Sequence, residues 1–280
     1  MSVENKTALY GLTAVPAQFP SPSSLTIKSS LTNDATKLRE LAAEEVATMP
    51  DTPLARRIDK YAKVQLPPQV YRHSRRVFAW GNAVVRGSTW GEKAVFEGEK
   101  GNIGDEKMAE SWFVTAMLHD IGTPEGTLKS TRLSYEFWAG FHALNILQDA
   151  SLTGDADKTN AVADREQAES VAEAILRHQD VQDKGKVSLL TRLIHIGTLL
   201  DNIGRGKEFI DQQTIENVVK EWSRTEADGE GRVESVWTDC FRGTVELEKK
   251  YKPYAMVSRI EGFEDVISEN GAKGGLFEGQ

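Results

Sequence analysis

Cysteine is almost absent from this chain, since its 280 residues include a single one, Cys240. One thiol excludes an internal disulfide and any cysteine-rich zinc module. Disulfide-free chains are typical of reducing compartments, so we expect the protein to work in the cytoplasm.

Long apolar runs and excess positive charge are lacking too. No stretch approaches the roughly 18 uncharged apolar residues that indicate a membrane-spanning helix. The N-terminus has no apolar signal core, and the C-terminus has no lipidation motif. Because 34 Lys and Arg face 42 Asp and Glu, the formal net charge is −8, which disfavours nucleic acids and anionic membranes as partners. We expect a soluble protein that acts on a small-molecule substrate.

Alternation with a period of two is also missing, whereas apolar residues recur at spacings of three and four. The sequence therefore predicts an all-α, single-domain fold with a core at about 68–205. Residues 1–33, rich in Pro, Ser and Thr, are predicted to form an extended arm, and residues 268–280 a flexible tail. The Gly- and Glu-rich segment 87–105 is predicted to be a surface loop. Helices are predicted at about 34–49, 53–63, 68–86, from 105 onward, 133–148, 164–179, 187–203, 212–222 and 232–250.

One of the five histidines is followed directly by an aspartate, as His119-Asp120. Neighbouring residues of a helix point about 100° apart, so both side chains can reach one ion only near a helix end. Gly122 supplies such an end two residues later. A polar pair at the end of an apolar helix is costly without partners, which makes it a candidate metal site. A capped helix end with a hydrogen-bonded histidine is the structural alternative.

Two further candidates lie on other apolar helices. His73 shares an inward-facing stripe with Val77, where it is either a ligand or a hydrogen-bonded core histidine. Asp201 needs a cationic partner, either a metal ion or an arginine. The order His, His-Asp, Asp on separate helices is the layout of a mononuclear metal site, and imidazole and carboxylate ligands suit zinc, iron or manganese. The arginines considered as partners of Asp201 are Arg132, Arg177 and Arg192.

The remaining histidines differ in their placement. His178 ends an apolar helix and faces the core, so substrate contact and metal ligation both stay open. His195 precedes Asp201 by six residues, roughly 120° around the helix, and is excluded from the site. His142 is interpreted as a core residue or a support for the site.

Several segments carry a resemblance to a known family. They read YRHSRRVFAWG (71–81), LHDIGT (118–123), STRLSYEF (130–137), QAESVAEAILRHQD (167–180), LLDNIG (199–204), KPY (252–254) and YGLTAVP (10–16). Together they resemble the cyanamide hydratase family within the HD-domain superfamily, over nearly the whole chain. The chain departs from the family at Ala139-Gly140, where a Gly-Gly pair is frequent, and its segments 87–105 and 150–163 are longer than the pattern needs.

The resemblance implies an HD-type helical fold and a zinc-dependent hydro-lyase that converts cyanamide to urea. The implied ligands of one Zn²⁺ per chain are His73, His119, Asp120 and Asp201, with iron or manganese left open. Zinc lowers the pKa of its water from about 15.7 to about 7, and the resulting hydroxide would attack the nitrile carbon. Asp120 and His178 are the candidate catalytic proton carriers. Thr123 and Asn202 are the candidate substrate-binding residues.

Other functions remain open on the sequence. An HD-type phosphohydrolase needs cations around its phosphate, and Arg72, Arg75 and Arg76 flank His73. A second possibility is a hydratase that acts on another small nitrile-like compound instead of cyanamide. The non-enzymatic alternative is a helical binding module whose His-Asp pair is purely structural. The family resemblance and the apolar terminal segments also predict a homo-oligomer.

Overall fold

The computed structural model describes residues 7–19, 38–87, 106–154 and 161–280. Helices dominate it, so the prediction of an all-α fold is confirmed. The α-helices are α2 (Ala43–Ala47), α3 (Pro53–Gln65), α4 (Pro68–Gly87), α6 (Glu106–Leu118), α7 (Glu125–Ser130), α8 (Tyr135–Gln148), α9 (Arg165–Leu176), α10 (Leu189–Ile203), α11 (Gln212–Glu221), α12 (Trp237–Tyr251) and α13 (Phe263–Gly271). Short 3₁₀ turns are η2 (Ala150–Thr153), η3 (Lys207–Phe209) and η4 (Met256–Arg259).

The first predicted helix is shorter than the sequence suggests. Of the range 34–49, residues 34–37 lie outside the described residues, and α2 spans only Ala43–Ala47. The backbone N–H of Leu41 donates to Thr214 Oγ1 of α11 at 2.7 Å, and that of Ala42 donates to Glu45 Oε2 at 2.9 Å. These donors are satisfied outside a helical ladder, so the helix begins after them.

Two small antiparallel sheets were not foreseen. β1 (Ala14–Pro16) pairs with β2 (Lys186–Ser188), and β3 (Thr225–Ala227) pairs with β4 (Val233–Val236). Strands of three or four residues are too short for a period of two to be recognised. The pairing of β1 with β2, directly before α10, attaches the described part of the predicted N-terminal arm to the core.

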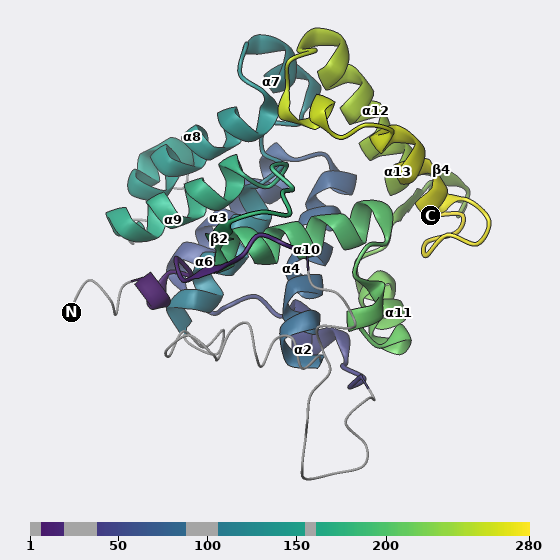
Figure 1. The fold of residues 1–280 in the computed structure, drawn as a ribbon, viewed down its shortest axis with the longest axis horizontal. Coiled ribbons are helices and arrows are strands. Elements are labelled where there is room, and N and C mark those ends of the chain that lie inside the picture. The colour runs from purple at the N-terminus through teal and green to yellow at the C-terminus, as the bar shows by residue number, and fades with distance from the viewer. Residues whose placement is uncertain (1–6, 20–37, 88–105, 155–160) are drawn as a thin grey trace.

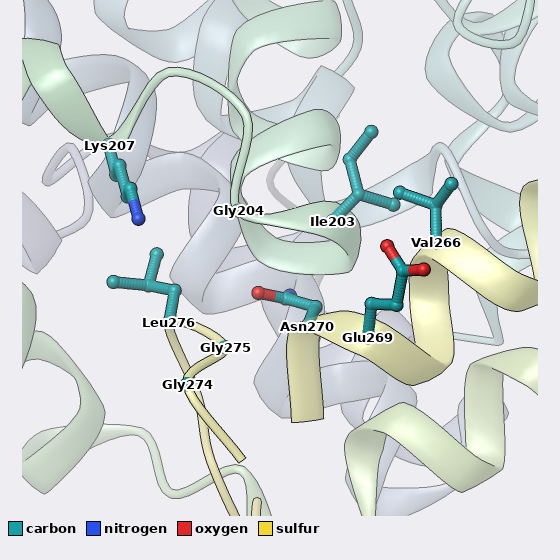
Figure 2. A pocket seen from close by; sticks show the side chains of 9 residues that line it. All are labelled: Ile203, Gly204, Lys207, Val266, Glu269, Asn270, Gly274, Gly275 and Leu276. Carbon is teal, nitrogen blue, oxygen red and sulfur yellow. The ribbon is translucent and has the colours of Figure 1, made fainter. Parts of the chain in front are cut away.

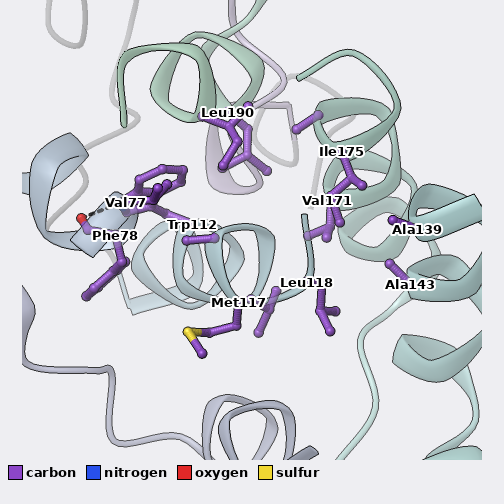
Figure 3. Close-up of a cluster of buried hydrophobic side chains, with 14 of the residues drawn as sticks. Val77, Phe78, Trp112, Met117, Leu118, Ala139, Ala143, Val171, Ile175 and Leu190 are labelled. Atoms are coloured by element: carbon purple, nitrogen blue, oxygen red, sulfur yellow. Dashed lines mark hydrogen bonds between the residues drawn. The ribbon is translucent and has the colours of Figure 1, made fainter. Parts of the chain in front are cut away.

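Helix α10 lies near the centre of the molecule and packs against α4, α6 and α9 (Figure 1). Every residue of α10 from Leu189 to Asn202 is buried, so this helix is enclosed by protein on all sides. Apolar side chains of α6 lie between those of α4 and those of α9 (Figure 3). This packing fixes the positions of the helices that carry the polar candidates. The labelled residues of Figure 3 are Val77, Phe78, Trp112, Met117, Leu118, Ala139, Ala143, Val171, Ile175 and Leu190.

The two C-terminal helices, α12 and α13, pack against α4 and α10. α12 contacts α4, and α13 packs on both α12 and α10. Residues 268–280, predicted to be a flexible tail, include the end of α13 and the buried Phe277, and their flexibility stays a prediction. The predicted loop 87–105 lies outside the described residues except for Gly87, the last residue of α4. Within the described part of the chain, no helix has both the length and the hydrophobicity needed to cross a membrane.

Candidate metal centre

Two chain segments bring the principal candidates together. His73 lies in the middle of α4, whereas α6 ends at Leu118 and His119 and Asp120 follow at once in a turn. Gly122 lets this turn approach the start of α8, because a Cβ there would lie 2.4 Å from the carbonyl oxygen of Tyr135. The helix end predicted from Gly122 is therefore present, and close packing against α8 explains why glycine occupies it.

The imidazoles of His73 and His119 and the carboxylate of Asp120 form a compact cluster. One ligand atom from each lies within 4.8 Å of the other two. The two Nε2 atoms are 3.2 Å apart, and Asp120 Oδ2 is 3.6 Å from His73 Nε2 and 3.3 Å from His119 Nε2. Three of the four predicted ligands thus converge on one point.

The ring nitrogens on the far side of these histidines face oxygen acceptors. His73 Nδ1 is 2.7 Å from Asp201 Oδ2, and His119 Nδ1 is 2.8 Å from the carbonyl oxygen of Ala116. An Nδ1 that faces such an acceptor carries the proton and donates it, which leaves the Nε2 lone pair directed at the cluster. Ligand histidines in metalloproteins are oriented by contacts of this kind.

His178, directly beyond the C-cap of α9, has the same arrangement. Its Nδ1 donates to the carbonyl oxygen of Ile175 at 2.7 Å. Its Nε2 is buried without a hydrogen-bond partner among the described residues and lies 3.8 Å from Asp120 Oδ1. A buried orphan nitrogen is costly, so its position at the cluster indicates a missing partner there.

Burial and mutual charge set the protonation of the cluster. Burial lowers the pKa of His73 to about 4 and that of His178 to about 3, so both rings are neutral at pH 7. Burial opposes the charge on Asp120 as well, yet the adjacent His119 holds the pKa of Asp120 below its usual value. Asp120 in turn raises the pKa of His119 against the effect of burial. The carboxylate therefore favours a positive charge in the cluster, which a divalent cation can supply.

Asp201 contacts the cluster from behind. Its carboxylate accepts a hydrogen bond from His73 Nδ1. It also accepts hydrogen bonds from Nε and Nη2 of Arg76, each at 2.9 Å. Trp80 Nε1 donates to Oδ1 at 2.9 Å, and Arg224 Nη1 is 2.9 Å from the same oxygen. Although burial opposes its ionisation, the two guanidinium groups hold the pKa of Asp201 well below its usual value.

The cationic partners of Asp201 are therefore Arg76 and Arg224 rather than Arg132, Arg177 or Arg192. Arg192 instead donates to the backbone carbonyls of Pro16 and Ala17. The sequence held a signal for Arg76, which lies one helical turn after His73. Arg224 lies outside the helices, between α11 and β3, where periodicity carries no information.

The two residues predicted to bind substrate take part in the architecture of the site. Thr123 Oγ1 donates to the carbonyl oxygen of Asp120 at 2.8 Å and closes the turn. Asn202 Oδ1 accepts from Trp237 Nε1 at 3.0 Å. Trp237, which the sequence did not identify, stacks on the His73 ring with centroids 4.1 Å apart and planes 13° apart.

Tyr135 is a second residue that was not foreseen. Its ring centroid lies 5.5 Å from that of His178, and its hydroxyl accepts from Gln179 Nε2 at 2.7 Å. Burial raises the pKa of Tyr135 well above its usual value, so the phenol stays protonated. From the sequence, a tyrosine at the start of an apolar helix is expected to be a core residue, so the position of Tyr135 beside His178 was not predicted.

The other two histidines lie away from the cluster. His142 Nε2 contacts the Tyr61 hydroxyl at 2.6 Å, and its ring stacks on Trp138. His195 Nε2 donates to the carbonyl oxygen of Arg177 at 2.8 Å. Both placements agree with their omission from the predicted ligand set.

The cluster fits a divalent cation of borderline or hard character. It offers the imidazole nitrogens of His73 and His119, the carboxylate of Asp120 and, at its edge, the orphan Nε2 of His178, and it contains no thiolate. No more than 2% of the surface of His73, His119, Asp120 or His178 is exposed. The cluster is therefore enclosed by protein.

Two yeast proteins are similar to this chain. Cyanamide hydratase DDI2 and cyanamide hydratase DDI3, both of Saccharomyces cerevisiae, are each 27% identical to it over 217 residues. The aligned part covers 77% of this chain and 81% of each relative. No protein-family model matches the chain. The resemblance to cyanamide hydratases seen in the motifs is therefore confirmed over about three quarters of the sequence.

Proposed function

We propose that this protein is a zinc-dependent hydratase that adds water to the nitrile group of cyanamide and releases urea. The buried convergence of His73, His119 and Asp120 carries this proposal, and the names of the two yeast relatives support it. An HD-type single-domain fold, a cytoplasmic location and homo-oligomeric assembly belong to the same proposal.

His73 and His119 would hold the ion through Nε2, and Asp120 through a carboxylate oxygen. Three protein ligands with a remaining open position are typical of catalytic zinc. When bound, the ion supplies Lewis-acid chemistry that lowers the pKa of water to about 7. The bonding of Asp201 supports a role in orienting His73 rather than direct ligation, because both of its oxygens already face donors.

The reaction needs a proton carrier as well as a nucleophile. The oxygen of water bonds to the nitrile carbon, one of its protons reaches the nitrile nitrogen, and the isourea formed tautomerises to urea. Asp120 Oδ1 and His178 Nε2 face each other at 3.8 Å. Because His178 is neutral and its Nε2 is free to accept, it can take a proton from water at Nε2 and return it from the same atom to the nitrile nitrogen.

Substrate size favours the same reaction. Cyanamide is a linear molecule with three heavy atoms, which suits a site whose residues are almost fully buried. The phosphohydrolase alternative requires free cations near the cluster, but the arginines that flank His73 bond elsewhere. Arg72 Nε donates to the carbonyl oxygen of Ser223 at 3.1 Å, Arg75 pairs with Asp59, and Arg76 pairs with Asp201.

Urea formation from cyanamide tests the proposal. The purified protein should produce urea, lose this activity when a chelator removes the metal, and regain it with Zn²⁺. His119→Ala should be inactive and metal-free. His142→Ala changes a histidine outside the cluster and should keep both its metal and its activity. Phosphate release from nucleotides without urea formation would favour the phosphohydrolase. A stably folded, metal-free and inactive protein would favour the binding module.

A further inference from the structure

The carboxylate of Asp201 lies at the centre of a buried network. Two guanidinium groups, an indole N–H and an imidazole N–H surround it, and all five residues are at most 1% exposed. One negative charge is thus opposed by two positive charges. Such a carboxylate has little charge left to offer a metal ion, but it is held rigidly enough to orient the ring that donates to it. The residues involved are His73, Arg76, Trp80, Asp201 and Arg224.

Arg224 connects this network to Trp237. Its Nη1 lies 2.9 Å from the carboxylate of Asp201 and donates to the backbone carbonyl of the same residue, also at 2.9 Å. Its own carbonyl accepts from the backbone N–H of Trp237 at 2.8 Å, at the residue that stacks on His73. One arginine therefore touches both supports of the His73 ring, one through its side chain and one through its backbone.

The C-terminal segment holds Arg224 in turn. The guanidinium carbon of Arg224 lies 3.8 Å from the centroid of the buried Phe277 ring. Asn270 Nδ2 donates to the carbonyl oxygen of Asp201 at 3.3 Å, and Phe277 N donates to the Asn270 carbonyl at 3.0 Å. Figure 2 shows Asn270 beside Gly204 at the end of α10, where it lines a hollow of about 150 Å³. The last residues of the chain thus pack against the end of α10 that carries Asp201.

We propose that Arg224 is a positioning residue of the metal centre. It holds Asp201, Asp201 fixes the His73 ring with its Nε2 toward the cluster, and Phe277 holds Arg224. This inference rests on the proposed metal centre and adds to it a dependence on the C-terminal segment. Loss of a partner that orients a metal-binding histidine typically weakens metal affinity about 10- to 100-fold.

Zinc affinity of the full-length protein, measured by competition with a chromophoric chelator, tests the proposal. Arg224→Gln should bind Zn²⁺ about 10- to 100-fold more weakly than the wild type. Arg192→Gln is the matched control, since Arg192 is equally buried but bonds to the backbone of Pro16 and Ala17. It should lose stability while its zinc affinity stays within about threefold of the wild type.

A second variant covers the case in which Arg224→Gln does not fold. Phe277→Leu keeps an apolar side chain but removes the ring over the guanidinium group, and it should weaken zinc binding several-fold. In the apo protein, ¹⁵N NMR should show the Nδ1–H tautomer of His73 in the wild type and loss of that single state in the variants. Folded variants with wild-type affinity, or equal weakening in Arg192→Gln, would overturn the role of Arg224. A wild-type protein that binds no zinc would instead overturn the metal centre itself.

Discussion

Three histidines of this chain share one arrangement at the residue scale. His73, His119 and His178 each direct Nδ1 to an oxygen acceptor and Nε2 toward Asp120. The acceptors are a carboxylate and two backbone carbonyls near helix ends, so helix geometry itself sets the tautomer for two of the rings. A neutral imidazole with a fixed Nδ1–H can serve either as a ligand or as a proton acceptor.

His178 provides the test that separates these two roles. His178→Ala should retain the metal, because His73, His119 and Asp120 remain, and should lose about 100- to 10,000-fold in kcat, the usual contribution of a proton-transfer group. Metal content and urea formation are measured on the same sample. Turnover equal to that of the wild type would refute the proton-carrier role, and a metal-free variant would make His178 a ligand.

Glu136, in the first turn of α8, should make stability depend on pH. Burial raises the pKa of its carboxyl group to about 7, against a usual 4.5. The folded state therefore keeps this proton after the unfolded state has lost it, and the contribution to stability, fully present below about pH 4.5, is lost as the pH rises to about 7. With about 1.4 kcal/mol for each pKa unit, the loss is on the order of 3 kcal/mol.

Glu136→Gln should remove this dependence. Denaturant unfolding should find the variant close to wild type at pH 4 and more stable at pH 8, by on the order of 3 kcal/mol. Glu246→Gln, an exposed carboxylate paired with Arg242, should change stability by less than about 1 kcal/mol at either pH. A Glu136→Gln variant that is less stable than the wild type at pH 8 would contradict the assignment.

The sequence identified part of this site and missed the rest for physical reasons. His73 and the His119-Asp120 pair were recognisable because each is a polar group on an otherwise apolar face. Asp201 was recognisable as a buried charge, but its partners Arg76 and Arg224 were not identified from the sequence. Which arginine reaches a buried carboxylate depends on tertiary packing, and Arg224 comes from a segment without any periodic pattern.

At the scale of elements, the site depends on how closely α4 and α10 approach. Gly197 of α10 faces Val77 of α4, and a Cβ at position 197 would lie 2.7 Å from the Val77 carbonyl oxygen and 2.8 Å from its Cγ1. These atoms belong to the helix that carries His73, four residues before Val77. The same approach brings Asp201 within 2.7 Å of His73.

Gly197→Ala should therefore affect both stability and the site. The added methyl group overpacks the helix contact and should cost about 1–3 kcal/mol of unfolding free energy, with weaker zinc binding as the helices separate. Gly243→Ala in α12 is the control, because nothing lies within 4 Å of its Cβ position. That exposed helical substitution should stabilise the protein by about 0.5–1 kcal/mol. Identical effects of the two substitutions in denaturant unfolding would contradict the close-contact account.

The long helices were predictable, and the short elements were not. Regular apolar spacing placed α3, α4, α8 and α10 within two residues of their observed ends. The helix expected at 232–250 instead begins at Trp237, because residues Val233–Val236 form β4. A strand of four half-exposed residues has too few positions to show its period, so only the folded chain reveals the hairpin.

At the scale of the whole molecule, the fold brings widely separated segments to one buried point. α4, the turn after α6, the end of α9 and α10 surround the cluster, Trp237 of α12 stacks on His73, and the C-terminal segment packs on Arg224. The apolar core around α10 holds these helices without help from any disulfide, since Cys240 is the chain's one cysteine. The account therefore rests on a metal centre made of nitrogen and oxygen ligands.

X-ray absorption spectroscopy combined with elemental analysis of the purified protein tests this claim most directly. The account predicts one zinc ion per chain with a first shell of nitrogen and oxygen at about 2.0–2.1 Å, including at least two imidazoles. It predicts no sulfur at about 2.3 Å and loss of the metal in His119→Ala. A protein without bound metal, or a first shell that contains the sulfur of Cys240, would contradict it.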